Sequence, residues 1–150
     1  MARKVRLIVF AVLAALVMCF IFSNSLQGSV ESNAKSGWVA AFLRPILNPF
    51  GWLEEEAYHK LVRKLAHFAE FGLLGLCLGG VAANVSWKRK WCFAAGAGVL
   101  TACIDETIQS FTGRTNSLKD VCIDSVGAAC GLVFVWLVLR GIKRYKERRS

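Results

Sequence analysis

The chain has 150 residues, a formal net charge of +9, and 55% hydrophobic against 19% charged residues. Its mean hydropathy of +0.47 is rare in a soluble domain of this length. The composition excludes a disordered chain, a collagen-like chain and a disulfide-rich secreted domain, and it indicates a membrane protein with one domain over residues 1–150. The excess of basic residues could bind nucleic acid, bind anionic lipid or set the membrane topology. The positions of the basic residues decide between these three explanations.

Four apolar segments are long enough to cross a bilayer, because a hydrocarbon core of about 30 Å requires about 20 apolar residues in a helix. They cover residues 5–22, 65–85, 91–111 and 121–139. Backbone groups cannot stay unpaired in lipid, so the predicted fold class is an all-α bundle of four transmembrane helices. The first segment could instead be a signal peptide, but it is longer than a typical signal core, and residues 22–25 lack a small-x-small cleavage site.

Basic residues gather at the N-terminus, in the turn between the second and third segments, and in the C-terminal tail. Four spans place these three regions on one side of the membrane, where Glu147 is the single acid. The basic residues there are Arg3, Lys4, Arg6, Lys88, Arg89, Lys90, Arg140, Lys143, Arg144, Lys146, Arg148 and Arg149. By the positive-inside rule this side is cytoplasmic, which predicts a multi-pass plasma-membrane protein with both termini in the cytoplasm. The basic tail is then a topology signal that also contacts anionic lipid, and nucleic acid is not an expected partner because no recognition motif accompanies the tail.

The long connection between the first two segments, residues 23–64, is predicted to lie outside and to form a short helical cap on the outer leaflet. A structureless connection of that length is uncommon. Ser36 can cap a short helix, and Pro45 and Pro49 are expected to break the chain after it. The acidic residues 54–56 favour the start of a further helix that runs directly into the second segment.

Ionisable and amide side chains occur at the outer ends of three of the segments. The second segment carries His67 and Glu70, the third carries Asp105, Glu106 and Gln109, and Asp120 and Asp124 lie at the outer end of the fourth. Random placement would scatter such groups across both leaflets. Because a charge near the bilayer centre costs roughly 3 kcal/mol, this cluster indicates an outward-facing functional site, and the alternative is a polar network that only fixes helix register.

The chemistry of each side chain suggests a role. His67 with Glu70, Asp105 or Glu106 could form a base and its orienting acid, so these four are the candidate catalytic residues. Arg114, in the link between the last two segments, could hold a phosphate or carboxylate by paired hydrogen bonds. The carboxylates could also collect a divalent cation. The other candidate ligand-binding residues are Lys64, Gln109, Asp120 and Asp124.

Glycines share the helix faces that carry these polar groups. Gly127 and Gly131 continue the stripe of Asp120 and Asp124, and the second segment carries glycines at positions 72, 75 and 79. Small residues let neighbouring helices approach closely, either within one chain or in a homo-oligomer.

At these residues the chain resembles the VanZ-like membrane proteins. The resemblance rests on residues 64–71 (KLAHFAEF), residues 105–111 (DETIQSF), the pair Gly113 and Arg114, Asp120, residues 127–131, and the polar exit of the first segment at residues 22–27. Two positions depart from the family pattern. Thr112 stands where the family commonly has Pro, and Asp124 stands where it often has Asn.

The resemblance implies a bacterial membrane protein with a role in resistance to teicoplanin-type glycopeptides, which act on peptidoglycan precursors outside the membrane. The partners it suggests are membrane lipid and either a lipid-linked cell-wall precursor or the glycopeptide itself. No cofactor is suggested beyond a divalent cation at the carboxylates.

Three functions stay open. The first is a site that binds or acts on a cell-envelope ligand. The second is a non-catalytic scaffold or antibiotic-binding protein in which the polar network is structural. The third is a proton- or ion-coupled transporter, which ranks last because the charged groups lie near one surface and no inverted repeat is visible.

Overall fold

The computed structural model describes residues 2–26, 29–112 and 117–149, with the backbone alone for residues 29–36. All regular structure in these ranges is helical. The five helices are α1 (Arg3–Ser25), α2 (Ser29–Leu47), α3 (Glu55–Asn84), α4 (Lys90–Phe111) and α5 (Leu118–Glu147).

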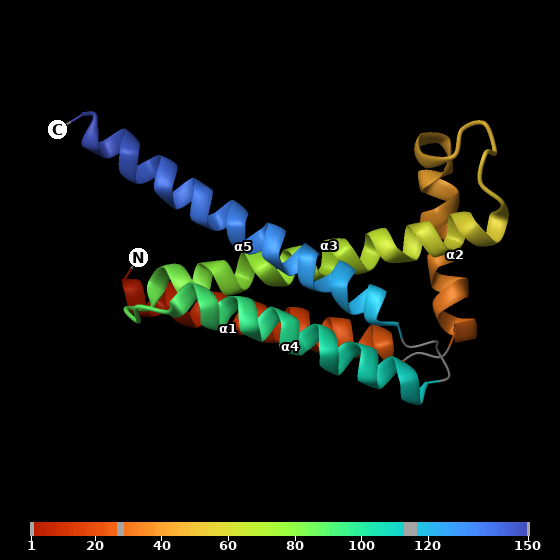
Figure 1. The fold of residues 1–150 in the computed structure, drawn as a ribbon, viewed down its shortest axis with the longest axis horizontal. Helices are drawn as coiled ribbons and strands as arrows, with labels where there is room; N and C mark the ends of the chain where they lie inside the picture. The colour runs from red at the N-terminus through yellow and green to blue at the C-terminus, as the bar shows by residue number, and fades with distance from the viewer. Residues whose placement is uncertain (1, 27–28, 113–116, 150) are drawn as a thin grey trace.

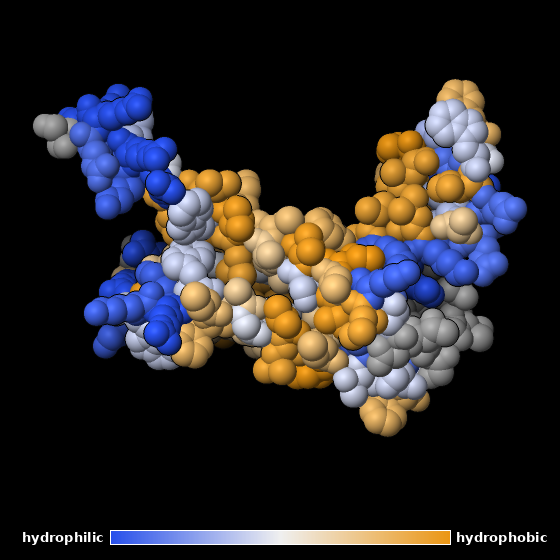
Figure 2. Space-filling model, in the orientation of Figure 1, coloured by the Kyte–Doolittle hydropathy of each residue, from blue (hydrophilic) through white to orange (hydrophobic). Residues whose placement is uncertain are grey.

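Four of the helices, α1, α3, α4 and α5, are long and apolar enough to cross a membrane. The space-filling view shows apolar residues across the middle of the visible face of the bundle, with hydrophilic residues at both ends (Figure 2). Most of the apolar side chains on these helices face outward, as Leu16, Leu100 and Phe134 do. A soluble protein would not expose so many large apolar side chains, so the predicted four-span membrane bundle is confirmed.

The bundle is organised around α3, which contacts each of the other four helices. Helices α1, α3 and α4 lie alongside one another, whereas α5 crosses α3 near its middle and diverges toward the C-terminus (Figure 1). Both termini and the α3–α4 turn lie at one end of the bundle (Figure 1). The opposite end holds the last turns of α1 and α4 and the first turns of α5, which is where the predicted polar residues fall.

The crossing of α3 and α5 is a backbone-to-backbone contact through glycine. A Cβ added at Gly75 would overlap the carbonyl oxygen of Ala128, and one added at Gly127 would overlap the carbonyl oxygen of Phe68. A Cβ at Gly131 would lie 2.7 Å from the backbone nitrogen of Leu76. The glycine faces predicted from the sequence therefore pair with each other within one chain.

A helix of the first connection, α2, lies across the end of α3 (Figure 1). Tyr58 of α3 is fully buried and donates a hydrogen bond to the carbonyl oxygen of Ala40 over 2.6 Å. The outer face of α2 exposes Trp38, Phe42 and Ile46, each more than 70% accessible. Their spacing of four residues forms one apolar stripe, which is typical of a helix that lies in a membrane interface.

The limits of α2 differ from those predicted. The helix begins at Ser29, so Ser36 lies inside it and is not its cap, and it passes through Pro45 and ends at Leu47. A proline removes one backbone donor and crowds the preceding turn. Only the last turn has to accommodate these effects here, and the amide of Asn48 still donates to the carbonyl of Arg44 over 2.9 Å. The predicted helix that starts in residues 54–56 and continues into the second span is confirmed by α3.

We expect Gly75→Ala to destabilise the bundle, because the new methyl group would force α3 and α5 apart. Overpacking of this kind costs about 1–3 kcal/mol, so the thermal unfolding temperature in detergent should fall. Gly96→Ala on α4 is the matched control, since a Cβ there meets nothing within 4 Å. Equal melting temperatures for the two variants would contradict the close packing of α3 on α5.

Candidate functional site

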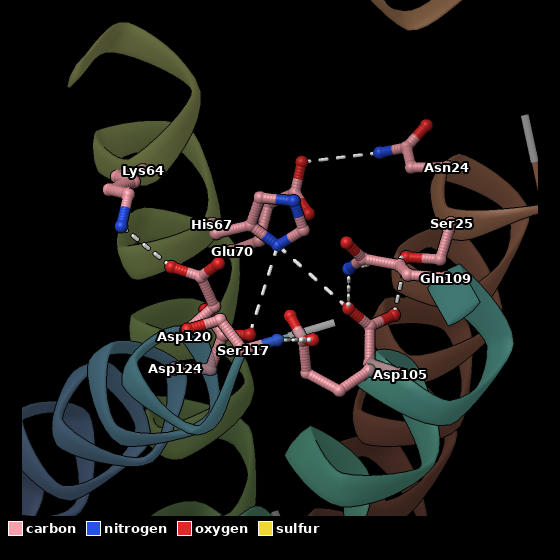
Figure 3. Close-up of polar contacts among 11 residues, drawn as sticks. Asn24, Ser25, Lys64, His67, Glu70, Asp105, Gln109, Ser117, Asp120 and Asp124 are labelled. Atoms are coloured by element: carbon pink, nitrogen blue, oxygen red, sulfur yellow. Dashed lines mark hydrogen bonds and ion pairs between the residues drawn. The ribbon is translucent and has the colours of Figure 1, made fainter. Parts of the chain in front are cut away.

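Four helices bring polar side chains together at the end of the bundle opposite the termini (Figure 3). The side chains drawn come from α1 (Asn24, Ser25), α3 (Lys64, His67, Glu70), α4 (Asp105, Gln109), the residue before α5 (Ser117), and α5 (Asp120, Asp124). Each segment alone would bury unpaired polar groups in lipid, so their convergence from separate helices lets them satisfy one another.

Asp105 is the centre of this network and is fully buried. Ser25 donates its hydroxyl to Oδ1 of Asp105 over 2.5 Å, and Gln109 donates its amide to Oδ2 over 2.6 Å. The same Gln109 amide also donates to the Ser25 hydroxyl over 3.3 Å. Donors on both sides fix the plane of the carboxylate.

His67 faces Asp105 and Asp124 across a gap. Its Nδ1 atom lies 3.9 Å from Oδ2 of Asp105 and 3.9 Å from Oδ2 of Asp124. Both distances exceed the roughly 2.7–3.2 Å of a direct hydrogen bond. Asp124 is 1% exposed, and its buried Oδ2 has no hydrogen-bond donor among the residues that the structure describes.

The two aspartates of α5 have different environments although they lie one helical turn apart. Asp120 accepts a hydrogen bond from the ammonium group of Lys64 over 2.7 Å, and both side chains stay about one third to two fifths exposed, at 32% and 42%. Asp124 lies deeper, on the side of His67. Lys64 and Asp120 therefore form the rim of the site, and Asp124 belongs to its interior.

The two glutamates join further helices within the site. Asn24 donates to Oε1 of Glu70 over 3.2 Å. The backbone amide of Ser117, the N-cap of α5, donates to Oε2 of Glu106 over 3.1 Å. A carboxylate at a helix N-terminus interacts favourably with the helix dipole, so Glu106 helps to hold the start of α5 against α4.

This arrangement supports two kinds of chemistry. An imidazole that faces two carboxylates can take up and release a proton, which suits general acid–base catalysis. The imidazole and carboxylate donor atoms of His67, Asp105 and Asp124 all lie within 4.8 Å of one another, so the three residues could instead share a metal ion.

The structure places eight of the nine predicted site residues in this network, and Arg114 lies outside the described residues. The prediction did not include Asn24, Ser25 or Ser117, which donate to Glu70, Asp105 and Glu106. The sequence feature that could have indicated Asn24 and Ser25 was the polar stretch at the end of the first apolar segment. It could not be assigned to the site without knowing that α1 ends beside α4.

Comparison with known proteins gives one match. A family model described as VanZ/LLP1 matches residues 10–139, a range that includes every site residue described above. No curated protein sequence and no solved structure shows a significant match to the chain.

We expect Ser25→Ala to lower the stability of the bundle, because it removes a donor from the buried Asp105 carboxylate. A buried acceptor that loses its donor costs about 1–3 kcal/mol. The control is Ser110→Ala, which removes an exposed hydroxyl that donates to the backbone carbonyl of Thr107. Thermal unfolding in detergent should show a clear fall for the first variant, and an equal response of both would contradict the role of Ser25.

Proposed function

We propose, from the premise that this chain belongs to the VanZ/LLP1 family, that it binds or acts on an amphiphilic cell-envelope ligand through the polar site at the end of its membrane bundle. The observation that carries the proposal is the group formed by the partly buried His67 and the buried Asp105 and Asp124 at one end of the membrane bundle. A network needed only for helix register does not require a histidine held away from two carboxylates. Amide–hydroxyl pairs such as Gln109 and Ser25 would suffice for that purpose.

The proposed orientation places the site at the outer surface. Twelve basic residues lie at the end of the bundle that holds both termini, with Glu147 as the one acid there. The positive-inside rule assigns that end to the cytoplasm, so the polar site faces the cell exterior in the outer leaflet of a bacterial plasma membrane. A ligand reaches it from the bilayer or from the cell envelope, where lipid-linked cell-wall precursors are found.

The rim of the site provides the contacts for an anionic head group. Lys64 is 42% exposed beside Asp120, and in the sequence Arg114 follows three residues after Phe111, the last residue of α4. Cationic side chains bind phosphate or carboxylate groups by charge-assisted hydrogen bonds. The exposed apolar stripe of α2, with Trp38 and Phe42, would rest on the acyl chains nearby. The proposed role is resistance to glycopeptides of the teicoplanin type, through such a ligand.

We expect His67→Ala and Glu106→Gln to abolish the resistance that the chain confers on a susceptible bacterial host. The measurement is the growth-inhibitory concentration of teicoplanin at matched membrane levels of each variant. Glu56→Gln is the control for the glutamate, because Glu56 is exposed on the first turn of α3, where Lys60 pairs with it over 2.6 Å. This control should keep the resistance of the unmodified chain, and the two site variants should match the empty vector.

The same experiment separates the two main functions. If both site variants keep full resistance at equal protein level, a binding or catalytic site is excluded. If resistance falls only in proportion to membrane level or melting temperature, the non-catalytic scaffold is supported instead. Loss of resistance in fully folded variants supports the ligand site.

A further inference from the structure

We infer that His67, Asp105 and Asp124 form a binding site for one divalent transition-metal ion of the Zn²⁺ type. The inference deepens the proposed function, because it concerns the interior of the same site. It names the ligand atoms and the class of metal, which the carboxylate pattern in the sequence left open.

The first observation is the geometry of the three donors. Nδ1 of His67 is 3.9 Å from one oxygen of each aspartate, and all three donor atoms lie within 4.8 Å of one another. A tetrahedral ion with ligand bonds near 2.1 Å holds neighbouring donor atoms about 3.4 Å apart. The two 3.9 Å gaps are too long for direct hydrogen bonds and slightly wider than this spacing, and no two of the donor atoms are more than 4.8 Å apart. A small movement of the side chains would close them around an ion.

The second observation is the state of Asp124. Its Oδ2 atom is buried, points toward His67, and has no hydrogen-bond donor within the described part of the chain (Figure 3). A buried carboxylate oxygen without a donor destabilises the fold, and a cation would relieve that cost. Asp120, one turn earlier, already has Lys64 as its partner, so its carboxylate does not need a cation in the same way.

The third observation is the support of the ligands by a second layer of residues. Both oxygens of Asp105 are held by donors, from Ser25 over 2.5 Å and from Gln109 over 2.6 Å. Metal-binding carboxylates are usually oriented by hydrogen bonds of this kind, while one lone pair stays directed at the ion. The three ligands come from α3, α4 and α5, so an ion here would also join three helices.

The donor set selects the metal. Ca²⁺ and Mg²⁺ take oxygen ligands almost exclusively, whereas an imidazole nitrogen favours Zn²⁺ and its neighbours among the transition metals. Three protein ligands leave one position of a tetrahedral ion open, as in zinc sites that bind an exogenous ligand. That position would accept water or a phosphate or carboxylate oxygen of the head group that we propose for the rim.

The test is metal retention by the purified full chain in detergent, with the purification tag removed. After chelation, the protein is incubated with Zn²⁺ or with the same concentration of Mg²⁺, desalted, and analysed by mass spectrometry of the metals. We expect one equivalent of Zn²⁺ per chain, no retained Mg²⁺, and a higher melting temperature with Zn²⁺. His67→Ala and Asp124→Asn should lose both effects, whereas Asp120→Asn, the matched control, should keep them.

Several outcomes would overturn the inference. These are absence of retained Zn²⁺, retention of Mg²⁺, and equal Zn²⁺ binding by His67→Ala, which would point to the six cysteines present in every variant. If the site variants do not fold, Co²⁺ added to the unmodified chain decides the matter. A near-ultraviolet cobalt–thiolate band would overturn the site, and visible bands without it would support nitrogen and oxygen ligands.

This test is independent of the resistance measurement. Zn²⁺ retention with no effect of His67→Ala on resistance would leave the metal site standing and refute the proposed function. If resistance depends on His67 but the chain retains no metal, the metal site is refuted and the proposed function stands.

Discussion

The contact of α3 with α5 through glycine is the constraint on which the rest of the structure depends. Gly127 of α5 meets the carbonyl of Phe68, the residue that follows His67, and Asp124 lies about one turn before Gly127. The absence of a side chain at Gly127 therefore lets the backbones approach, and this approach sets the distance between His67 and Asp124. In a bilayer, where lipid gives little hydrophobic drive for helix association, close packing of small residues is the main source of such contact.

The polar site depends on that packing and also reinforces it. Ser25 of α1 and Gln109 of α4 both bind Asp105, and Lys64 of α3 binds Asp120 of α5, so hydrogen bonds join the helices at one end of the bundle. These bonds form away from bulk water, where an unpaired polar group is costly. These contacts therefore stabilise the bundle, and the proposed function gives the same group of residues a chemical role as well. His67 and Asp124 are the residues for which these two roles differ. Their facing atoms are 3.9 Å apart, so the pair contributes little to helix association.

Much of the fold and the membership of the site could be predicted from the sequence. Apolar length identified four spans, and their alternating direction placed His67, Asp105 and Asp124 at one end without any coordinates. The extent of α2 could not be predicted, because Ser36 and Pro45 are local signals that the packing of Ala40 on Tyr58 outweighs. The hydrogen bond from Ser25 to Asp105 could not be predicted either, because it depends on where α1 ends relative to α4.

The sequence by itself determined the class of the molecule, the number of its spans and the end at which its ionisable groups gather, because these follow from the length and periodicity of apolar segments. Only the tertiary structure decided which groups are partners. Asp120 and Asp124 are alike in sequence, yet one meets Lys64 at the rim and the other faces His67 in the interior. That difference arises from the tilt of α5 across α3, which is set by contacts between residues far apart in the chain.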